Sequence, residues 1–186
     1  MNKPRTDLGT LLQAASFSAD KHQHQRRKGI DPAPYINHPL EVASILANVA
    51  EVTDLTTLVA ALLHDTVEDT GTKPEEIETL FGRPVRMIVE EVTDDKTLPK
   101  PDRKRLQIEH APTLSTAAKM VKISDKICNI REVTHKPPAD WPLQRRREYL
   151  DWAERVVAQC GQVNDALERE FRETLKECRT ALSDVS

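Results

Sequence analysis

The sequence predicts an all-α fold, a bundle of about eight to ten helices formed by a single domain over residues 1–186. Only five of the 186 residues are glycines and 4% are aromatic, whereas the helix-favouring Ala, Leu, Glu, Lys and Arg are abundant. No segment alternates apolar and polar residues over the length of a strand between Gly or Asn turns. A chain of this length is expected to form one domain.

The charge balance and the cysteines exclude several classes of protein. Thirty acidic residues against 27 basic ones leave a net charge of −3, so we expect neither a nucleic acid polymer nor a membrane surface as a partner. No apolar run approaches the roughly 18 residues that a membrane span needs, and no signal peptide is recognisable. The three cysteines have no CxxC spacing, which is typical of reduced thiols, and the expected location is the cytoplasm.

The first third of the chain predicts two amphipathic helices joined by a loop. Apolar residues that recur at spacings of three and four predict a helix over residues 6–25. One glycine and two prolines then predict a loop over residues 26–36. Asn37 can cap a second helix, which is expected to end near Glu51.

A third helix is expected to lie near the centre of the bundle. Thr53 or Asp54 can cap it, and residues 55–63 are nearly uniformly apolar. The same helix is expected to continue through His64 and to end at Gly71, because glycine favours helix C-termini.

The remaining helices follow from cap residues and prolines. The segment from Asp94 to Asp102 predicts a loop of about nine residues, which is longer than most connectors and therefore a candidate binding loop. Three prolines between residues 137 and 142 interrupt the chain before a last long helical stretch. The helices expected in this part of the chain cover residues 74–81, 83–92, 103–110, 113–131 and 143–182, the last broken near Gly161.

The strongest local signal for chemistry follows the most apolar helix. His64 and Asp65 are neighbours, and Glu68 and Asp69 come one helical turn later. Three carboxylates at the C-terminal end of a helix oppose the helix dipole, and a bound cation would resolve this conflict. An ordinary solvated acidic helix end is the alternative interpretation.

Two further segments supply candidate metal ligands. Asp125 lies on an otherwise apolar side of its predicted helix, so it needs a partner, either a metal ion or an arginine. Asn129, one turn later, is expected to face the same cavity. His38 at a helix start is by itself a surface or capping residue, but with the other candidates it completes a set of two imidazoles and two carboxylates. Such a set, formed by His38, His64, Asp65 and Asp125, suits Mn²⁺, Fe²⁺, Co²⁺ or Zn²⁺.

These segments together resemble a known family. From about Leu11 to about residue 170 the sequence is similar to the HD-domain small alarmone hydrolases of the metazoan SpoT homologue type, related to the hydrolase half of RelA/SpoT enzymes. The motifs that carry the resemblance are RRK at 26–28, YINHP at 35–39, ALLHDTVEDT at 61–70, EVTDDKTLPK at 91–100 and SDKICN at 124–129.

The resemblance implies a reaction and a role for the acidic residues. The four candidate ligands would hold one Mn²⁺, and Glu68 and Asp69 would serve the attacking water. The reaction would remove pyrophosphate from the 3′ position of ppGpp or pppGpp. The chain departs from the family pattern at Ser124 and Cys128, where the family commonly has Ala and Tyr, and this puts packing or base selectivity in doubt more than the chemistry.

Basic residues in two loops are candidates for phosphate binding. Arg27 and Lys28 come just before His38 in the sequence, and arginine binds phosphate well because its guanidinium can bond two oxygens at once. Lys96 and Lys100 on the long loop are candidates for the 5′ phosphates, or else ordinary solvated lysines.

Other residues have weaker assignments. The resemblance implies an aromatic contact to the nucleotide at Tyr149, and a tyrosine on a helix surface is the alternative. Three arginines at 145–147 are expected to lie on a helix surface. The remaining expectations are a surface position for His22 and His24 and a core position for Met87 and Met120.

Two alternative functions stay open. The same site would suit another nucleotide, such as a pppApp-type adenosine alarmone or NADPH with its 2′-phosphate. A non-catalytic HD domain that senses nucleotides would show erosion of the ligands or of the Glu68–Asp69 pair, and none is eroded. In each case the expected partner is a small-molecule nucleotide, and the absence of room for an α/β synthetase domain favours degradation over synthesis.

Overall fold

The computed structural model describes residues 6–29 and 32–184 and is all-α, as the sequence predicts. Within these residues there are ten α-helices and one 3₁₀ turn, and no strand is formed. The helices and the turn are α1 (Asp7–Lys21), α2 (Asn37–Asn48), α3 (Leu55–Leu63), α4 (Thr66–Thr70), α5 (Pro74–Phe81), α6 (Arg83–Val92), α7 (Lys100–His110), η1 (Ala111–Thr113), α8 (Thr116–His135), α9 (Leu143–Cys160) and α10 (Asp165–Ser183). None of the described helices is long and apolar enough to cross a membrane.

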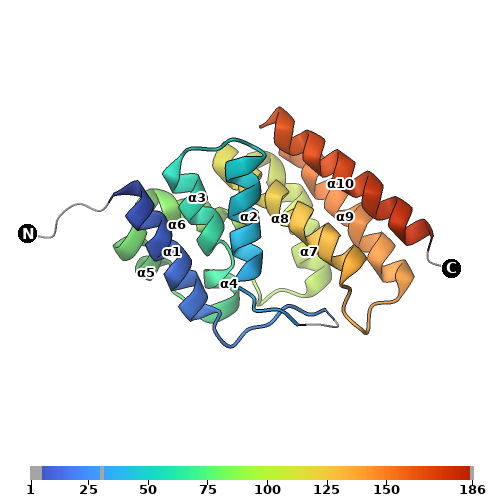
Figure 1. Ribbon diagram of the computed structural model, residues 1–186, viewed down its shortest axis with the longest axis horizontal. Coiled ribbons are helices and arrows are strands. Elements are labelled where there is room, and N and C mark those ends of the chain that lie inside the picture. The colour runs from blue at the N-terminus through green and yellow to red at the C-terminus, as the bar shows by residue number, and fades with distance from the viewer. Residues whose placement is uncertain (1–5, 30–31, 185–186) are drawn as a thin grey trace, which may run out of the picture.

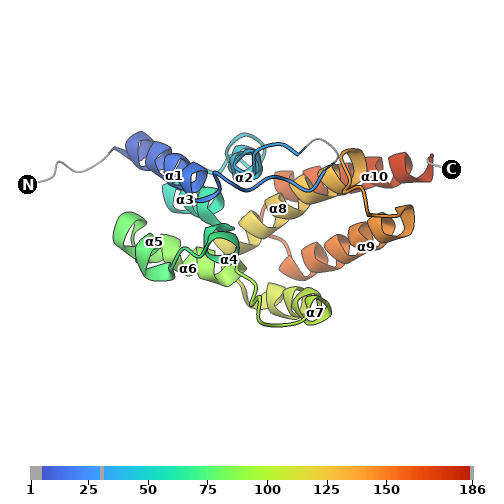
Figure 2. The same cartoon turned by 90° about the horizontal axis from the view of Figure 1, so that it is seen from below.

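Helix α8 connects the two ends of the molecule. It contacts α2, α3 and α6 on one side and α9 and α10 on the other, and Figures 1 and 2 show it running between the N-terminal helices and the C-terminal pair. Most of its apolar side chains are buried, and Ile123, Ile127 and Ile130 are fully so. Because α8 carries Asp125 through this core, the carboxylate lies where three other helices meet.

Local side-chain signals explain where several helices begin. Asp54 accepts hydrogen bonds from the backbone N and the Oγ1 of Thr57, at 2.9 and 2.6 Å, and so caps α3. Ser115 caps α8 and Asn164 caps α10 in the same manner. The bounds predicted for α5 and α6 are confirmed, and each helix has a proline in its first turn.

The predicted continuous helix from Leu55 to Gly71 is wrong. The chain breaks at His64 and Asp65 into α3 and the short α4, which ends at Gly71 in a left-handed conformation with φ of 75°. The His64 ring bonds the carbonyl of Ala61 at 2.8 Å, and the Thr66 hydroxyl donates to that of Leu63 at 2.7 Å. These side chains occupy carbonyls that a continuous helix would use for its own backbone bonds.

Three smaller expectations also need correction. Met87 is 50% exposed, because Val85, Ile88 and Val89 form the buried face of α6. His22 is only 2% exposed. Arg146 does not simply decorate α9: it donates to the carbonyls of Val133 and Thr134 at the end of α8. As expected, His24 is exposed and Met120 packs against the core.

Candidate metal and catalytic site

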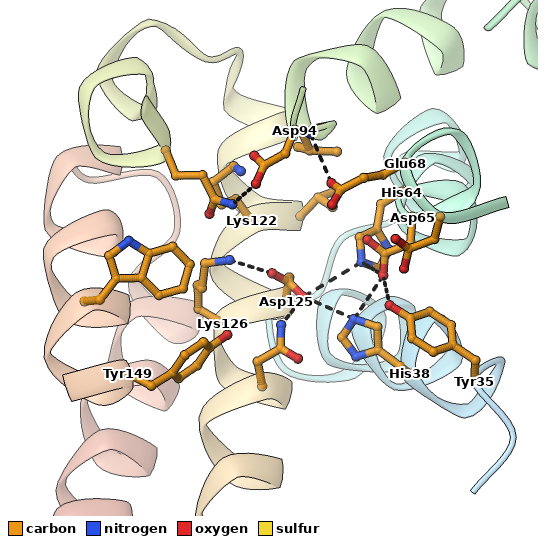
Figure 3. Close-up of a pocket in the computed structure, with 16 residues that line it drawn as sticks. Tyr35, His38, His64, Asp65, Glu68, Asp94, Lys122, Asp125, Lys126 and Tyr149 are labelled. Atoms are coloured by element: carbon orange, nitrogen blue, oxygen red, sulfur yellow. Dashed lines mark hydrogen bonds and ion pairs between the residues drawn. The ribbon is translucent and has the colours of Figure 1, made fainter. Parts of the chain in front are cut away.

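The four predicted metal ligands converge from three separate parts of the fold. His38 lies in the first turn of α2, His64 and Asp65 form the junction between α3 and α4, and Asp125 projects from the middle of α8 (Figure 3). Ligand atoms of His38, His64 and Asp65 all lie within 4.8 Å of one another. Asp125 approaches this cluster from the opposite side, next to both imidazoles.

The distances in the cluster are short. His38 Nε2 lies 3.1 Å from Asp125 Oδ1 and 3.5 Å from Asp65 Oδ2. His64 Nε2 lies 3.1 Å from Asp65 Oδ2 and 3.8 Å from Asp125 Oδ1. Both histidine side chains are almost fully buried, whereas the two carboxylates keep 18% and 16% of their surface exposed. The exposed edge of the cluster is therefore formed by oxygen atoms, with nitrogen atoms behind them.

One hydrogen bond of His64 fixes the orientation of its ring. Because a carbonyl can only accept, the 2.8 Å contact with Ala61 places a proton on Nδ1. Nε2 then faces the carboxylates, 3.1 Å from Asp65 Oδ2, and a metal ion bound there would take the place of a proton on this nitrogen. Metal-binding histidines commonly donate their second nitrogen to a carbonyl in this way.

The ionisation of these groups also favours a cation at the centre. Burial opposes ionisation of Asp65, but the neighbouring His64 lowers the pKa of this carboxyl below its usual range, and Asp125 has a lowered pKa beside Lys126. Burial lowers the pKa of His38. Burial acts on His64 in the same direction, but the nearby carboxylates outweigh it and raise its pKa to about 10. A divalent cation can replace the proton that His64 holds between two carboxylates.

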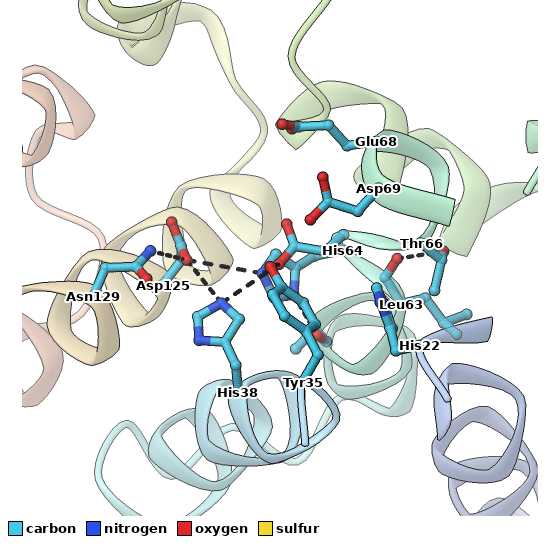
Figure 4. Close-up of polar contacts among 12 residues, drawn as sticks. His22, Tyr35, His38, Leu63, His64, Thr66, Glu68, Asp69, Asp125 and Asn129 are labelled. Atoms are coloured by element: carbon cyan, nitrogen blue, oxygen red, sulfur yellow. Dashed lines mark hydrogen bonds and ion pairs between the residues drawn. The ribbon is translucent and has the colours of Figure 1, made fainter. Parts of the chain in front are cut away.

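The two predicted catalytic acids lie beside this cluster on α4 (Figure 4). Glu68 Oε2 accepts a hydrogen bond from the backbone N of Asp94 at 3.0 Å. Burial, together with the charge of Asp94, raises the pKa of Glu68 to about 7. Asp69 Oδ2 accepts from Gln25 Nε2 at 3.1 Å, and Lys96 contacts Asp69 Oδ1 from the other side.

Three side chains hold the Asp65 and Asp125 carboxylates in place. Tyr35 donates its hydroxyl to Asp65 Oδ2 at 2.7 Å, while Lys126 and Asn129 donate to the two oxygens of Asp125 at 2.8 and 2.6 Å. Sequence reasoning anticipated Asn129 but assigned no role to Tyr35 or Lys126. Both stand inside quoted motifs, and their position next to predicted ligands is the signal that could have found them.

Five of the six predicted substrate residues line a larger outer cavity of about 560 Å³, which shares lining residues with an inner cavity of about 190 Å³ at the cluster of His38, His64, Asp65 and Asp125. The outer cavity is lined by Arg27, Lys28, Lys96, Asn129 and Tyr149, among others. Arg27 is anchored by Glu132 and by Asn129 Oδ1, the latter at 3.0 Å.

Aromatic side chains form another part of the outer wall. Tyr149 lines both cavities and lies between Trp141 and Trp152, with ring centres 5.7 and 5.2 Å away. Lys100 is not brought to the cavity lining with the other predicted residues. Its Nζ lies 5.5 Å from the centre of the Trp141 ring. Trp141, which lines the outer cavity, was not singled out from the sequence.

Comparison with known proteins shows to which family the chain belongs. The HD domain family model matches residues 14–151. The guanosine-3′,5′-bis(diphosphate) 3′-pyrophosphohydrolase MESH1 of Xenopus tropicalis is 55% identical over 88% of this chain and 91% of its own length, and that of Homo sapiens is 50% identical over 92% and 96%. A solved metazoan orthologue of SpoT, described as hydrolysing ppGpp, superposes with a TM-score of 0.88 at 41% identity, covering 95% of this chain and 98% of its own. The chain therefore belongs to the HD-domain hydrolases, in the family of small alarmone hydrolases that includes MESH1 and the metazoan SpoT orthologue.

Proposed function

We propose that this protein is a Mn²⁺-dependent hydrolase that removes the 3′-pyrophosphate from ppGpp and pppGpp, giving GDP or GTP and pyrophosphate. The observation that carries the proposal is the meeting of two buried imidazole nitrogens and two carboxylates within 4 Å of their neighbours, in an inner cavity that shares lining residues with an outer cavity lined by cationic side chains. The names of the relatives support the guanosine alarmone as substrate.

His38, His64, Asp65 and Asp125 would hold the metal ion. Imidazole and carboxylate ligands suit several divalent metals, and Mn²⁺ is our choice among them because the family resemblance implies it. A divalent cation in such a site acts as a Lewis acid and lowers the pKa of a water ligand. The remaining chemistry belongs to side chains of this protein.

Glu68 is the general base in this proposal. It accepts the proton of the water whose oxygen attacks the phosphorus attached to the 3′ oxygen, and the bond between that phosphorus and the 3′ oxygen breaks. A base with a pKa of about 7 suits this role, because about half of it is ionised in neutral solution and it is still basic enough to take a proton. Asp69, which follows Glu68 in α4, orients the same water.

Cationic side chains of the outer cavity would meet the phosphates. Arg27 and Lys28 line the cavity and would face the developing charge on the 3′ phosphate oxygens. Lys96 would bind the 5′ phosphates, for which Lys100 is a second candidate, and Tyr149 and Asn129 would contact the nucleoside.

We also propose that residues 1–186 act as one domain, since the buried apolar residues form one cluster across the helices. The protein is proposed to be cytoplasmic, since all three cysteines are free and buried.

A turnover panel tests the proposal. Purified protein, stripped of metal and then supplied with Mn²⁺, is assayed for phosphate and pyrophosphate release from ppGpp, pppGpp, pppApp and NADPH. We expect pyrophosphate from the two guanosine substrates with Mn²⁺ and none after chelation. Preference for pppApp or NADPH would overturn the guanosine assignment, and undiminished turnover after thorough chelation would overturn the metal dependence.

A further inference from the structure

A buried histidine lies behind the catalytic acids. His22, which follows α1, is 2% exposed, and its ring centre is 4.7 Å from that of Tyr35 (Figure 4). Its Nδ1 lies 2.7 Å from Gln25 Oε1, and its Nε2 has no partner within residues 6–29 and 32–184. The reaction described above assigns this residue no role.

Gln25 is hydrogen-bonded to both Asp69 and His22, and in each of these two bonds the donor and the acceptor can be assigned. Ionised Asp69 accepts only, so the group that faces its Oδ2 at 3.1 Å is the amide nitrogen of Gln25. The amide oxygen of Gln25 then faces His22 and needs a donor there. His22 therefore carries its proton on Nδ1, and this proton fixes which way the Gln25 amide points.

The same segment also reaches a metal ligand. The backbone of Gln25 accepts from Tyr35 N at 3.1 Å, and the backbone of Arg27 donates to Ala33 at 3.0 Å, so the two sides of the loop are held together. Tyr35, whose ring packs against that of His22 at a tilt of 30°, donates to Asp65. The buried His22 and the half-buried Gln25 and Tyr35 thus form one unit that contacts both Asp65 and Asp69.

Asp69 is held differently on its two sides. Lys96, which contacts Oδ1, has 47% of its side chain exposed and lines the outer cavity, where substrate phosphates would compete for it. Gln25, which is half-buried and also lines the outer cavity, contacts Oδ2 and is itself held by the buried His22. When substrate phosphates bind Lys96, the hydrogen bond from Gln25 still keeps the Asp69 carboxylate oriented.

We propose that His22 is a positioning residue for hydrolysis: its Nδ1 proton orients the Gln25 amide, which in turn orients Asp69 toward the attacking water. The proposal rests on the proposed function, because it gives Asp69 that role. The proposal predicts that kcat depends on a hydrogen-bond donor at the position of His22 Nδ1, whether or not residue 22 has a ring.

Two substitutions of His22 distinguish a positioning role from a merely structural one. His22→Asn places an amide N–H near the position of Nδ1, whereas His22→Gln places it near the position of Nε2. We expect His22→Gln to lower kcat roughly 10- to 100-fold with KM and bound Mn²⁺ unchanged, as is usual for loss of a supporting hydrogen bond. His22→Asn should stay within about threefold of the wild-type kcat. His24→Gln and His24→Asn, at an exposed position two residues away, are the matched controls and should leave kcat unchanged.

The result that overturns the proposal is an equal kcat for His22→Asn and His22→Gln, whether both are low, as for a merely structural role, or both normal. If His22→Gln does not fold, Gln25→Glu keeps the shape but sets a carboxylate against Asp69, and a normal kcat for it contradicts the proposal. Imidazole ¹⁵N NMR of the wild-type protein provides a readout without turnover, since a proton on Nε2 of His22 with none on Nδ1 would also contradict the proposal. Absence of alarmone hydrolysis by the wild type would instead count against the proposed function.

Discussion

The position of Glu68 on α4 gives its carboxyl a pKa that suits the proposed role of general base. Its carboxyl is partly buried near Asp94, and burial together with that charge raises its pKa to about 7, while the backbone hydrogen bond from Asp94 opposes the shift. Lys96 and Arg103 lie farther off, 3.8 and 4.0 Å from Glu68 Oε1. The ionised form is the base, so activity requires a pH above this pKa.

The first prediction concerns the pH dependence of hydrolysis. As the pH falls through about 7, Glu68 takes up a proton, and kcat/KM should fall about tenfold per pH unit below that point, well above the range of an ordinary glutamate. A pH profile of kcat/KM with saturating Mn²⁺ measures this. Glu68→Gln should retain Mn²⁺, lose roughly 10²- to 10⁴-fold in rate and lose this acidic limb. A profile that stays level down to pH 5 would exclude Glu68 as the base.

Residue roles were predictable only where a side chain has a motif of its own. His38, His64, Asp65 and Asp125 were chosen because their residue types are metal ligands, and the structure brings their donor atoms together. His22 and Tyr35 could not be found in this way. The roles proposed for them rest on contacts that the fold creates, with Gln25 for His22 and with Asp65 for Tyr35, and the local sequence does not distinguish a buried histidine from an exposed one.

At the scale of the element, α3 determines where His64 and Asp65 lie. Six of its residues are buried, among them Leu62 and Leu63, so the helix is fixed in the core. Its C-terminal end therefore lies at the His–Asp cluster that includes His64 and Asp65. Its N-terminus is fixed by Asp54, which accepts two hydrogen bonds from Thr57. These hydrogen bonds lower the pKa of the Asp54 carboxyl.

The second prediction is that this cap stabilises the protein. Asp54→Ala should lower the free energy of unfolding by about 1 kcal/mol at neutral pH, measured by urea denaturation, whereas Asp54→Asn should lose little because asparagine also caps well. The folded-state pKa of Asp54 is below its unfolded value, so the stabilisation by ionised Asp54 is fully present above the unfolded pKa of about 3.9. It is lost as the pH falls through the folded pKa, and Asp54→Asn should lack this pH dependence. Equal stability of Asp54→Ala and wild type would show that the cap contributes nothing.

Helix positions were predictable to the extent that caps and prolines mark them. The bounds of α5 and α6 were predicted because each helix follows a polar or glycine residue and has a proline in its first turn. The same reasoning failed at α7, which begins at Lys100 because Pro101 serves as a first-turn residue and not as a loop residue. The break between α3 and α4 was missed because it depends on side chains that bond to carbonyls, and apolar periodicity does not report such bonds.

At the scale of the whole molecule, the site exists only when distant segments pack together. His38 on α2 and Asp125 on α8 are far apart in the sequence, and α2, α3 and α8 contact one another in the core. The sequence predicted that these residues share a site but not the geometry, because helix packing and not spacing sets the distances between their side chains. Folding therefore brings two carboxylates and two imidazoles into one buried cluster.

The last prediction follows from that coupling between folding and the metal site. An ion that binds the folded chain but not the unfolded one stabilises it by about 2.7 kcal/mol at a free concentration 100 times its Kd. For a chain of this length, 1 kcal/mol corresponds to roughly 2–4 °C, so saturating Mn²⁺ should raise the Tm of the metal-free protein by about 5–11 °C. Scanning calorimetry with and without Mn²⁺ measures the shift. Asp125→Asn removes a ligand and should abolish most of it, whereas Glu68→Gln leaves the four ligands intact and should keep it. A Tm of the wild type that does not respond to Mn²⁺, Zn²⁺, Fe²⁺ or Co²⁺ would mean that the cluster is held together by its own protons and binds no ion.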